Sequence, residues 1–324
     1  MAGPPGAGSP VGVRDEAPRL ESLADARARI GARLAGVSRC VAVASGKGGV
    51  GKSLVTVHLA LALARRGLRV AVLDADLNSP SVAKMLGLRG QPLRASAEGL
   101  SPVPGPLGLA VQSMDFFLQG TQALDWEGPE GEGAAWRSAL ESAALADLLA
   151  ETAWGSRDVL LIDLPPGPDR LPALAQLLRS DAPRAGAQRE ARPAVPGTLA
   201  VTIPTEVALL SLERAVRRAR EARIPLIGLV ENLSHAVCGR CGAEGPLFRE
   251  APTEARARDL ELPIVARVPF DPELGAAADA GRPIGADGAE APAAGSAAGA
   301  GKVFDELAER VLGWAPPPLE GEVW

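Results

Sequence analysis

Short apolar runs alternate with longer segments of helical period along most of this chain. Five runs have the length and composition of strands, and they lie at residues 69–73, 158–162, 198–203, 226–230 and 264–268. Between most of them, segments such as 207–222 place Ala, Leu and Val at helical spacing among charged residues. Strands that alternate with helices predict an α/β fold with a mostly parallel sheet covered by helices on both faces. Ligands of such folds collect at the carboxyl ends of the strands.

The two ends of the chain and two internal stretches differ from this pattern. Residues 1–18 are rich in Gly and Pro, and the apolar positions that follow predict a short amphipathic helix at Leu20, Leu23, Ile30 and Leu34. We therefore expect a flexible N-terminal extension over 1–38, one domain over 39–315 and a disordered tail over 316–324. The low-complexity stretches 180–197 and 285–301 are interpreted as surface loops or linkers without chemistry.

Composition limits the function classes. Hydrophobic residues make up 47% of the chain, enough for a sizeable core, but aromatics are 3% and tyrosine is absent, so Ala, Val and Leu must fill it. The net charge of −5 gives no general basic footprint for nucleic acid. No apolar stretch has membrane-spanning length, and the N-terminus lacks the layout of a secretory signal. Three cysteines do not make a disulfide framework. We expect a cytoplasmic protein without a nucleic-acid or membrane partner.

A glycine-rich loop holds half of the lysines. Of four lysines, Lys47 and Lys52 lie within residues 45–53, whereas positive charge elsewhere is almost entirely arginine. The loop matches the pattern G-x-x-x-x-G-K-[ST] and lies between the apolar run 40–44 and the helix-like segment 54–66. Its backbone N–H groups would surround a phosphate, Lys52 would reach the β- and γ-oxygens, and Ser53 would bind Mg²⁺. A plain glycine-rich turn is the alternative, but it requires none of this context. The residues expected to bind ATP here are Gly46, Lys47, Gly48, Gly49, Val50, Gly51, Lys52 and Ser53.

Carboxylates follow two of the strands, where a magnesium nucleotide would need them. Asp163 ends the run 159–162 and is expected to hold magnesium together with Ser53. Asp74 and Asp76 end the run that begins at residue 69, and Asp76 is favoured as the residue that orients the attacking water. A carboxylate at a strand end can also be a simple helix cap.

Residues 45–53 resemble the deviant Walker A motif of the MinD/ParA/nitrogenase iron protein class. The resemblance implies a P-loop NTPase fold and an ATP-sandwiched homodimer, in which Lys47 reaches the phosphates of the opposite subunit. Further segments resemble the Mrp-type iron–sulfur cluster carriers, in order from about residue 41 to 313. Those segments are 74–81, 161–167, 231–234, 238–241, 269–272 and 281–284. This resemblance also implies that Asn232 contacts the adenine base.

A C-x-x-C pair distinguishes a cluster carrier from its relatives. Cys238 and Cys241 form half of a four-thiolate site, and Cys40, at the start of a buried strand, is poorly placed to help. A homodimer with one pair from each subunit would complete a bridging cluster, with [4Fe–4S] favoured. A structural zinc site and a redox dithiol are the alternatives.

Several positions depart from the pattern of these relatives. Leu54 stands where a threonine is usual, Asn78-Ser79 replaces tyrosine-glycine, and Pro168-Asp-Arg170 replaces a small Thr-Gly-Asp-like segment. Glu127 occupies a position where arginine is expected. Most of these changes lie in the segments that follow Asp76 and Asp163, which are expected to act as nucleotide-dependent switches, and not in the phosphate loop. We therefore expect nucleotide binding with slow hydrolysis.

The sequence therefore predicts a homodimeric ATPase that receives an iron–sulfur cluster from an assembly scaffold and passes it to apo iron–sulfur proteins. One alternative is a MinD/ParA-like positioning ATPase, which would need a basic surface or terminal helix. The terminal segment 303–314 is instead acidic, with Asp305, Glu306 and Glu309. Another alternative is a degenerate ATP-binding scaffold with structural zinc at the C-x-x-C pair.

Overall fold

The computed structural model describes residues 22–118, 133–179, 196–237, 241, 243–248, 252–287 and 296–315. Three segments discussed above lie outside these residues: the Gly/Pro-rich start, most of the stretch 180–197, and the tail 316–324. Cys238 and Glu127 are also outside them.

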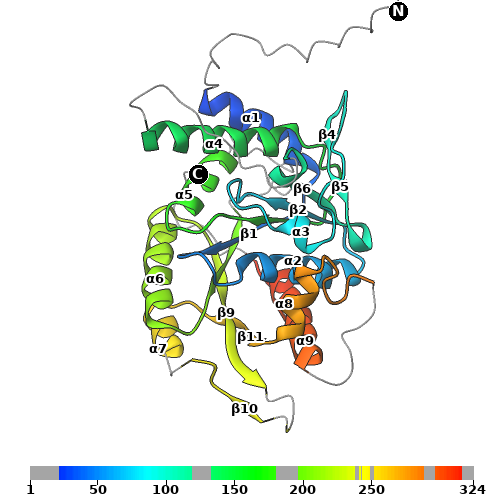
Figure 1. The fold of residues 1–324 in the computed structure, drawn as a ribbon. Coiled ribbons are helices and arrows are strands. Elements are labelled where there is room, and N and C mark those ends of the chain that lie inside the picture. Colours follow the sequence, from blue (N-terminus) through cyan, green and yellow to red (C-terminus); the bar gives the residue numbers. More distant parts are fainter. Residues whose placement is uncertain are drawn as a thin grey trace, which may run out of the picture.

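A nine-stranded sheet forms the centre of the described part (Figure 1). Its strands follow the order β10-β9-β8-β1-β7-β2-β6-β5, and β11 pairs with β9. All pairs are parallel except β5 with β6 and β10 with β9. The strands are β1 (Cys40–Ser45), β2 (Val70–Asp74), β5 (Val103–Pro104), β6 (Ala110–Ser113), β7 (Val159–Asp163), β8 (Gly197–Thr202), β9 (Leu226–Val237), β10 (Glu244–Gly245) and β11 (Ile264–Phe270). A separate hairpin consists of β3 (Arg94–Ser96) and β4 (Gly99–Ser101).

Helices cover both faces of the sheet, which confirms the predicted α/β architecture (Figure 1). Alternate residues of β1 serve opposite faces: Val41 and Val43 pack into a core with α2 and α9, whereas Ala42 and Ala44 pack into one with α1, α4 and α5. The helices are α1 (Leu23–Arg33), α2 (Lys52–Arg65), α3 (Val82–Met85), α4 (Gly133–Glu151), α5 (Arg170–Leu178), α6 (Glu206–Glu221), α7 (Thr253–Asp259), α8 (Pro272–Asp279) and α9 (Ser296–Gly313). Short 3₁₀ turns lie at η1 (Leu34–Gly36), η2 (Pro106–Gly108) and η3 (Met114–Phe116). Within the described residues, none of these helices is long and apolar enough to cross a membrane.

Helix α2, which carries the end of the glycine loop, is buried on all sides over its middle. Every residue from 55 to 63 is at most 3% exposed. His58 shares this environment: its Nδ1 lies 2.9 Å from the Leu54 carbonyl oxygen, and its ring stacks on Phe304 of α9 at a centroid distance of 5.1 Å. Apolar burial on this scale fixes α2 firmly between the sheet and α9.

The predicted strands lie within one or two residues of the observed ones at all ends but one. Strand β9 continues to Val237, well past the predicted end at 230, because β11 and β10 pair with its second half. The strands β3, β4, β5, β6 and β10 were not predicted at all.

The prediction that 285–301 is a surface loop is wrong for its last residues. Helix α9 begins at Ser296, and Ala300 is fully buried where α9 packs against α2 and β11. Ala300 and Gly301 are small enough for this close packing, and composition alone misrepresented the segment as a loop. The amphipathic helix within 1–38 forms as α1, and Ile30 and Leu34 are buried against the domain. Leu23, also predicted on the apolar face, is exposed, and Leu20 lies outside the described residues.

Candidate nucleotide site

The glycine loop, residues 45–53, connects β1 to the N-terminus of α2. Gly51 has a φ of 82°, in the left-handed region, and a Cβ at this position would lie 2.1 Å from Nδ2 of Asn232. A Cβ on Gly46 would lie 2.2 Å from the carbonyl oxygen of Ser211 in α6. Glycine is therefore required at Gly51 by both the backbone conformation and the close packing, and at Gly46 by the close packing. The loop and the helix N-terminus together offer the backbone N–H groups and partial positive charge that bind phosphate.

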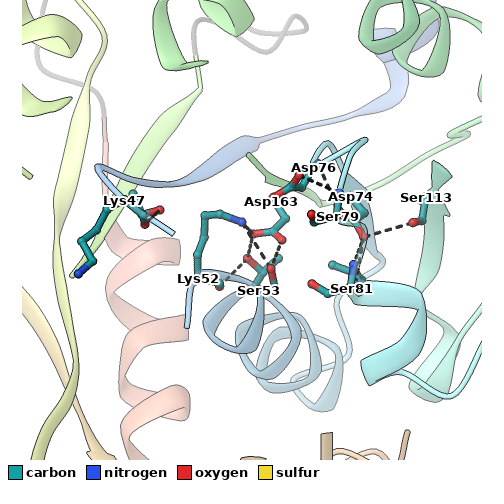
Figure 2. A network of polar contacts seen from close by, with 12 residues as sticks. Lys47, Lys52, Ser53, Asp74, Asp76, Ser79, Ser81, Ser113 and Asp163 are labelled. Carbon is teal, nitrogen blue, oxygen red and sulfur yellow. Dashed lines mark hydrogen bonds and ion pairs between the residues drawn. The ribbon is translucent and has the colours of Figure 1, made fainter. Parts of the chain in front are cut away.

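The remaining loop residues differ in exposure. Gly48 and Gly49 are exposed, whereas Val50 is buried in the core. Lys47 is half-buried, and its side chain points away from Lys52 and Asp163 (Figure 2). The side chains of Lys47 and Lys52 therefore lie on different sides of the loop.

Asp163, at the end of β7, organises the polar centre of the site (Figure 2). Its Oδ1 lies 2.8 Å from Lys52 Nζ and accepts a hydrogen bond of 2.9 Å from Thr56 Oγ1. Its Oδ2 accepts a 2.6 Å hydrogen bond from Ser53 Oγ. Both charged side chains are buried, at 7% exposure for Lys52 and 0% for Asp163, so the pairing satisfies charges that would be very costly alone. Ser53 and Asp163, the two residues predicted to hold Mg²⁺, are thus in direct contact, and their binding of Mg²⁺ stays a prediction.

Thr56 is a site residue that the sequence analysis missed. It lies one helical turn after Lys52 on α2, and the i, i+4 spacing places both side chains on one face of the helix. That spacing was the signal that could have found it.

Asp74 and Asp163 are direct neighbours across the β2–β7 pair. Asp74 is fully buried, and its Oδ2 accepts hydrogen bonds from the backbone N–H groups of Ser81 and Val82 and from Ser113 Oγ, at 2.9 to 3.2 Å. Burial, and secondarily the negative charge of Asp163, raise the pKa of Asp74 to about 7. The bonds to residues 81 and 82 make Asp74 an anchor for the segment after β2, and Ser113 was not foreseen from sequence.

Asp76 is more accessible than Asp74. Its Oδ1 accepts a hydrogen bond of 3.2 Å from the backbone N–H of Ser79. Burial raises the pKa of Asp76, while the positive charge of Lys52 opposes that rise. A half-buried carboxylate beside the glycine loop and close to Lys52 has the accessibility that an interaction with water requires, and Asp74 does not.

Asn232, in β9, lies against the glycine loop. Its Nδ2 donates a 2.9 Å hydrogen bond to the Val50 carbonyl oxygen, and the side chain is 2% exposed. Its Oδ1 has no hydrogen-bond partner among the described residues. Asn232 therefore supports the loop backbone and retains an unused acceptor.

The cysteines occupy two unlike environments. Cys241 is exposed, whereas Cys40 is buried at the start of β1, where burial raises the pKa of its thiol to about 12. A buried thiol that resists ionisation is a poor metal ligand, which agrees with leaving Cys40 out of the predicted pair. In the part of the chain that the structure describes, no group of three or more His, Cys, Asp and Glu side chains could hold a metal ion; Cys238 lies outside that part.

Comparison with known proteins agrees with this geometry. Residues 36–311 match the family model described as ParA, NUBPL iron-transfer P-loop NTPase. The iron-sulfur cluster carrier protein of Saccharolobus solfataricus is 36% identical over 273 residues, which cover 84% of this chain and 82% of that protein. The protein of the same name from Pyrococcus abyssi is 35% identical over 283 residues, with 84% and 85% covered.

Solved structures show the same fold. A nucleotide-binding protein from Archaeoglobus fulgidus, determined in complex with ADP, superposes with a TM-score of 0.63 at 32% identity, covering 79% of this chain and 91% of that one. The cell division ATPase MinD of Pyrococcus furiosus superposes with a TM-score of 0.54 at 21% identity, covering 85% and 98%. The match to the family model spans most of the chain, and the glycine loop, Lys52 and Asp163 have the arrangement expected of an ATPase. This chain belongs to the ParA-type, NUBPL iron-transfer family of P-loop NTPases.

Proposed function

We propose that this ATPase is a homodimeric carrier that binds an iron–sulfur cluster at Cys238 and Cys241 and transfers it to apo-proteins. Three features support the proposal: the family, the names of the relatives, and the presence of a C-x-x-C pair just after β9. The observation that carries the nucleotide part is the buried group of Lys52, Ser53 and Asp163 at the end of the glycine loop.

ATP with Mg²⁺ fits this site. Mg²⁺ prefers oxygen ligands, and the Ser53 hydroxyl and the Asp163 carboxylate lie 2.6 Å apart at the helix N-terminus. Mg²⁺ would be held by Ser53 and Asp163, and Lys52 would turn from Asp163 toward the phosphates. The bound ion would neutralise developing charge on the phosphates. Asp76 would orient the attacking water, and Asn232 would present its unused Oδ1 toward the adenine base.

A dimer would complete both chemistries of the proposal. Lys47 points away from the Lys52 side of the loop, which suits a role at the phosphates of a second subunit. Two thiolates per chain are half of the four that a [4Fe–4S] cluster takes. We infer a cytoplasmic carrier that works between an assembly scaffold and apo iron–sulfur proteins, with slow hydrolysis.

Anaerobic iron–sulfur reconstitution tests the cargo. Wild type should gain visible absorbance and one cluster per dimer, and the Cys238→Ala/Cys241→Ala variant should gain neither. Cys40→Ala is the matched control, because this buried thiol should leave cluster binding unchanged. The wild-type cluster should then pass to an apo-ferredoxin.

Other outcomes identify the alternatives. Stoichiometric zinc with no reconstitutable cluster would overturn the carrier proposal and make the C-x-x-C pair structural. If the protein holds zinc in this way and binds ATP normally without hydrolysing it, the degenerate ATP-binding scaffold would be favoured. Hydrolysis stimulated by DNA or anionic vesicles would favour the positioning ATPase.

A further inference from the structure

One carboxylate on α4 contacts two segments that leave the nucleotide site. Glu141 Oε1 accepts a 2.9 Å hydrogen bond from Asn78 Nδ2, and its Oε2 lies 2.8 Å from Arg170 Nη1. The Glu141 side chain is only 12% exposed, so its carboxylate is largely shielded from water, whereas the Asn78 side of the contact is exposed. A shielded carboxylate with two donors forms charge-assisted bonds that are stronger than an ordinary surface pair.

Both partners of Glu141 follow site residues closely in sequence. Asn78 is two residues after Asp76, in the segment after β2. Arg170 begins α5 and ends the segment that leaves Asp163 after β7. Glu141 itself is 63 residues from Asn78 and 29 from Arg170, so no local sequence pattern connects the three. They meet because α4 crosses the same face of the sheet as α1 and α5.

The surroundings favour a firm connection. Glu141, Asn78 and Arg170 line a small pocket of mixed polarity, and its apolar wall consists of the buried side chains of Ala75, Leu77, Leu145 and Leu164. On the other side of the segment after β7, Asp169 Oδ1 accepts a 2.9 Å hydrogen bond from Arg218 of α6. The segment 165–170 is therefore held from both sides, by α6 through an exposed pair and by α4 through a shielded one.

Arg170 also affects the electrostatics of Asp76. Burial is the main influence and raises the pKa of Asp76, while the positive charge of Arg170 is among the contributions that oppose the rise. Moving Arg170 would therefore change both the position of one segment and the charge around the carboxylate in the other.

We propose that Glu141 is a positioning residue for hydrolysis: it fixes the segment after β2 and the segment after β7 relative to each other, so that Asp76 and Asp163 keep one geometry around the nucleotide. This inference rests on the proposed role of Asp76. Glu141 touches no reacting atom, and its effect passes through Asn78 and Arg170.

Glu141→Ala tests the proposal against a matched control on the same helix. Glu151 of α4 pairs with Arg29 of α1 and contacts neither segment, so Glu151→Ala removes an ion pair from the same helix, though from a more exposed carboxylate (47% against 12%). Glu141→Ala should lower kcat for ATP about 10- to 100-fold while the nucleotide Kd changes less than about threefold. Glu141→Gln keeps one acceptor and should fall between wild type and Glu141→Ala. Adding Asn78→Ala to Glu141→Ala should cause little further loss, because the shared contact is already gone.

Hydrogen exchange supplies a readout that does not depend on turnover. In the nucleotide-free protein, peptides covering 76–80 and 165–170 should both exchange faster in Glu141→Ala and remain unchanged in Glu151→Ala. Equal effects of the two substitutions on kcat and thermal stability would reduce Glu141 to a structural residue and overturn the proposal. So would faster exchange in only one of the two peptides. A wild type that fails to hydrolyse ATP would count against the role of Asp76 and not against the connection, which the exchange experiment decides by itself.

Discussion

Lys52 Nζ lies 2.8 Å from Asp163 Oδ1, in a buried ion pair that joins the first residue of α2 to the last residue of β7. The two groups that a magnesium nucleotide would engage thus satisfy each other. Binding a nucleotide would replace one charge pair with two, Lys52 with phosphate and Asp163 with Mg²⁺ or its bound water. The charge balance of the site is preserved in both arrangements, which avoids an isolated buried charge.

Lys52→Ala should damage both binding and stability. The substitution leaves the Asp163 carboxylate buried with hydroxyl donors but no cation, which should lower the free energy of unfolding by about 3 kcal/mol. Nucleotide affinity should fall at least about tenfold, because a charge-assisted phosphate contact is lost. Denaturant unfolding and binding of a fluorescent ATP analogue measure the two effects. Lys302→Ala, at an 80% exposed lysine, is the control and should change neither. Wild-type values for Lys52→Ala would contradict this account of the site.

Gly51→Ala should cost more stability than Gly49→Ala. Both glycines have positive φ, at 82° and 77°, so each substitution should cost about 1 kcal/mol in backbone strain. Only at Gly51 does the new Cβ collide with Asn232, whose bond to Val50 would then break at a further cost of about 1–3 kcal/mol.

The Asn232→Ala background separates these two contributions. There the difference between the glycine substitutions should shrink toward zero, as measured by urea unfolding. An undiminished difference would show that Asn232 is not the obstacle.

Asp76→Asn should reduce turnover without abolishing binding. If Asp76 orients the attacking water, loss of its charge should lower kcat about 100-fold and leave nucleotide Kd within about threefold. Phosphate release and nucleotide binding, measured on the same preparation, give the two numbers. Asp158→Asn is the control, because Asp158 pairs with Arg69 at the opposite end of β7. Unchanged phosphate release would transfer the role to another residue.

His58 should make the protein less stable in mild acid. Burial is the main cause that lowers the pKa of His58 to about 4 from the ordinary 6.5. Between pH 6.5 and 4 the histidine is therefore protonated in the unfolded chain and neutral in the folded protein. The contribution of neutral His58 to the free energy of unfolding is present above pH 6.5 and is lost as the pH falls toward 4. Between pH 7 and 5 wild type should lose about 2 kcal/mol more than His58→Phe, which keeps a ring against Phe304.

The comparison with His58→Phe is needed because Asp74 acts in the opposite direction. Its raised pKa favours the folded state as pH falls from about 7, but this contribution is common to both proteins and cancels in the difference. Urea unfolding at the two pH values gives that difference. Parallel pH profiles for the two proteins would contradict the buried neutral state of His58.

The sequence predicted the central strands and the glycine loop because both are coded locally. Apolar runs marked β1, β2, β7, β8 and β11, and the motif placed Lys52 and Ser53 at a helix start. Strand β6 escaped because it is four residues long, and Ala110 to Ser113 carry little of the β-branched signal. The contacts of Glu141 were not predicted for a different reason: nothing near Glu141 in the sequence indicates either of its partners. Whether Cys238 and Cys241 bind metal stays a prediction.

The burial of α2 has a consequence for how this sequence can change over generations. A helix at a protein surface can accept neutral substitutions on its outer face, but residues 55 to 63 have no outer face. Exchanges there must conserve volume or be matched by changes in α9 or the sheet. The segment behind the glycine loop should therefore vary slowly, and most of the freedom to alter turnover lies in the segments that surround it.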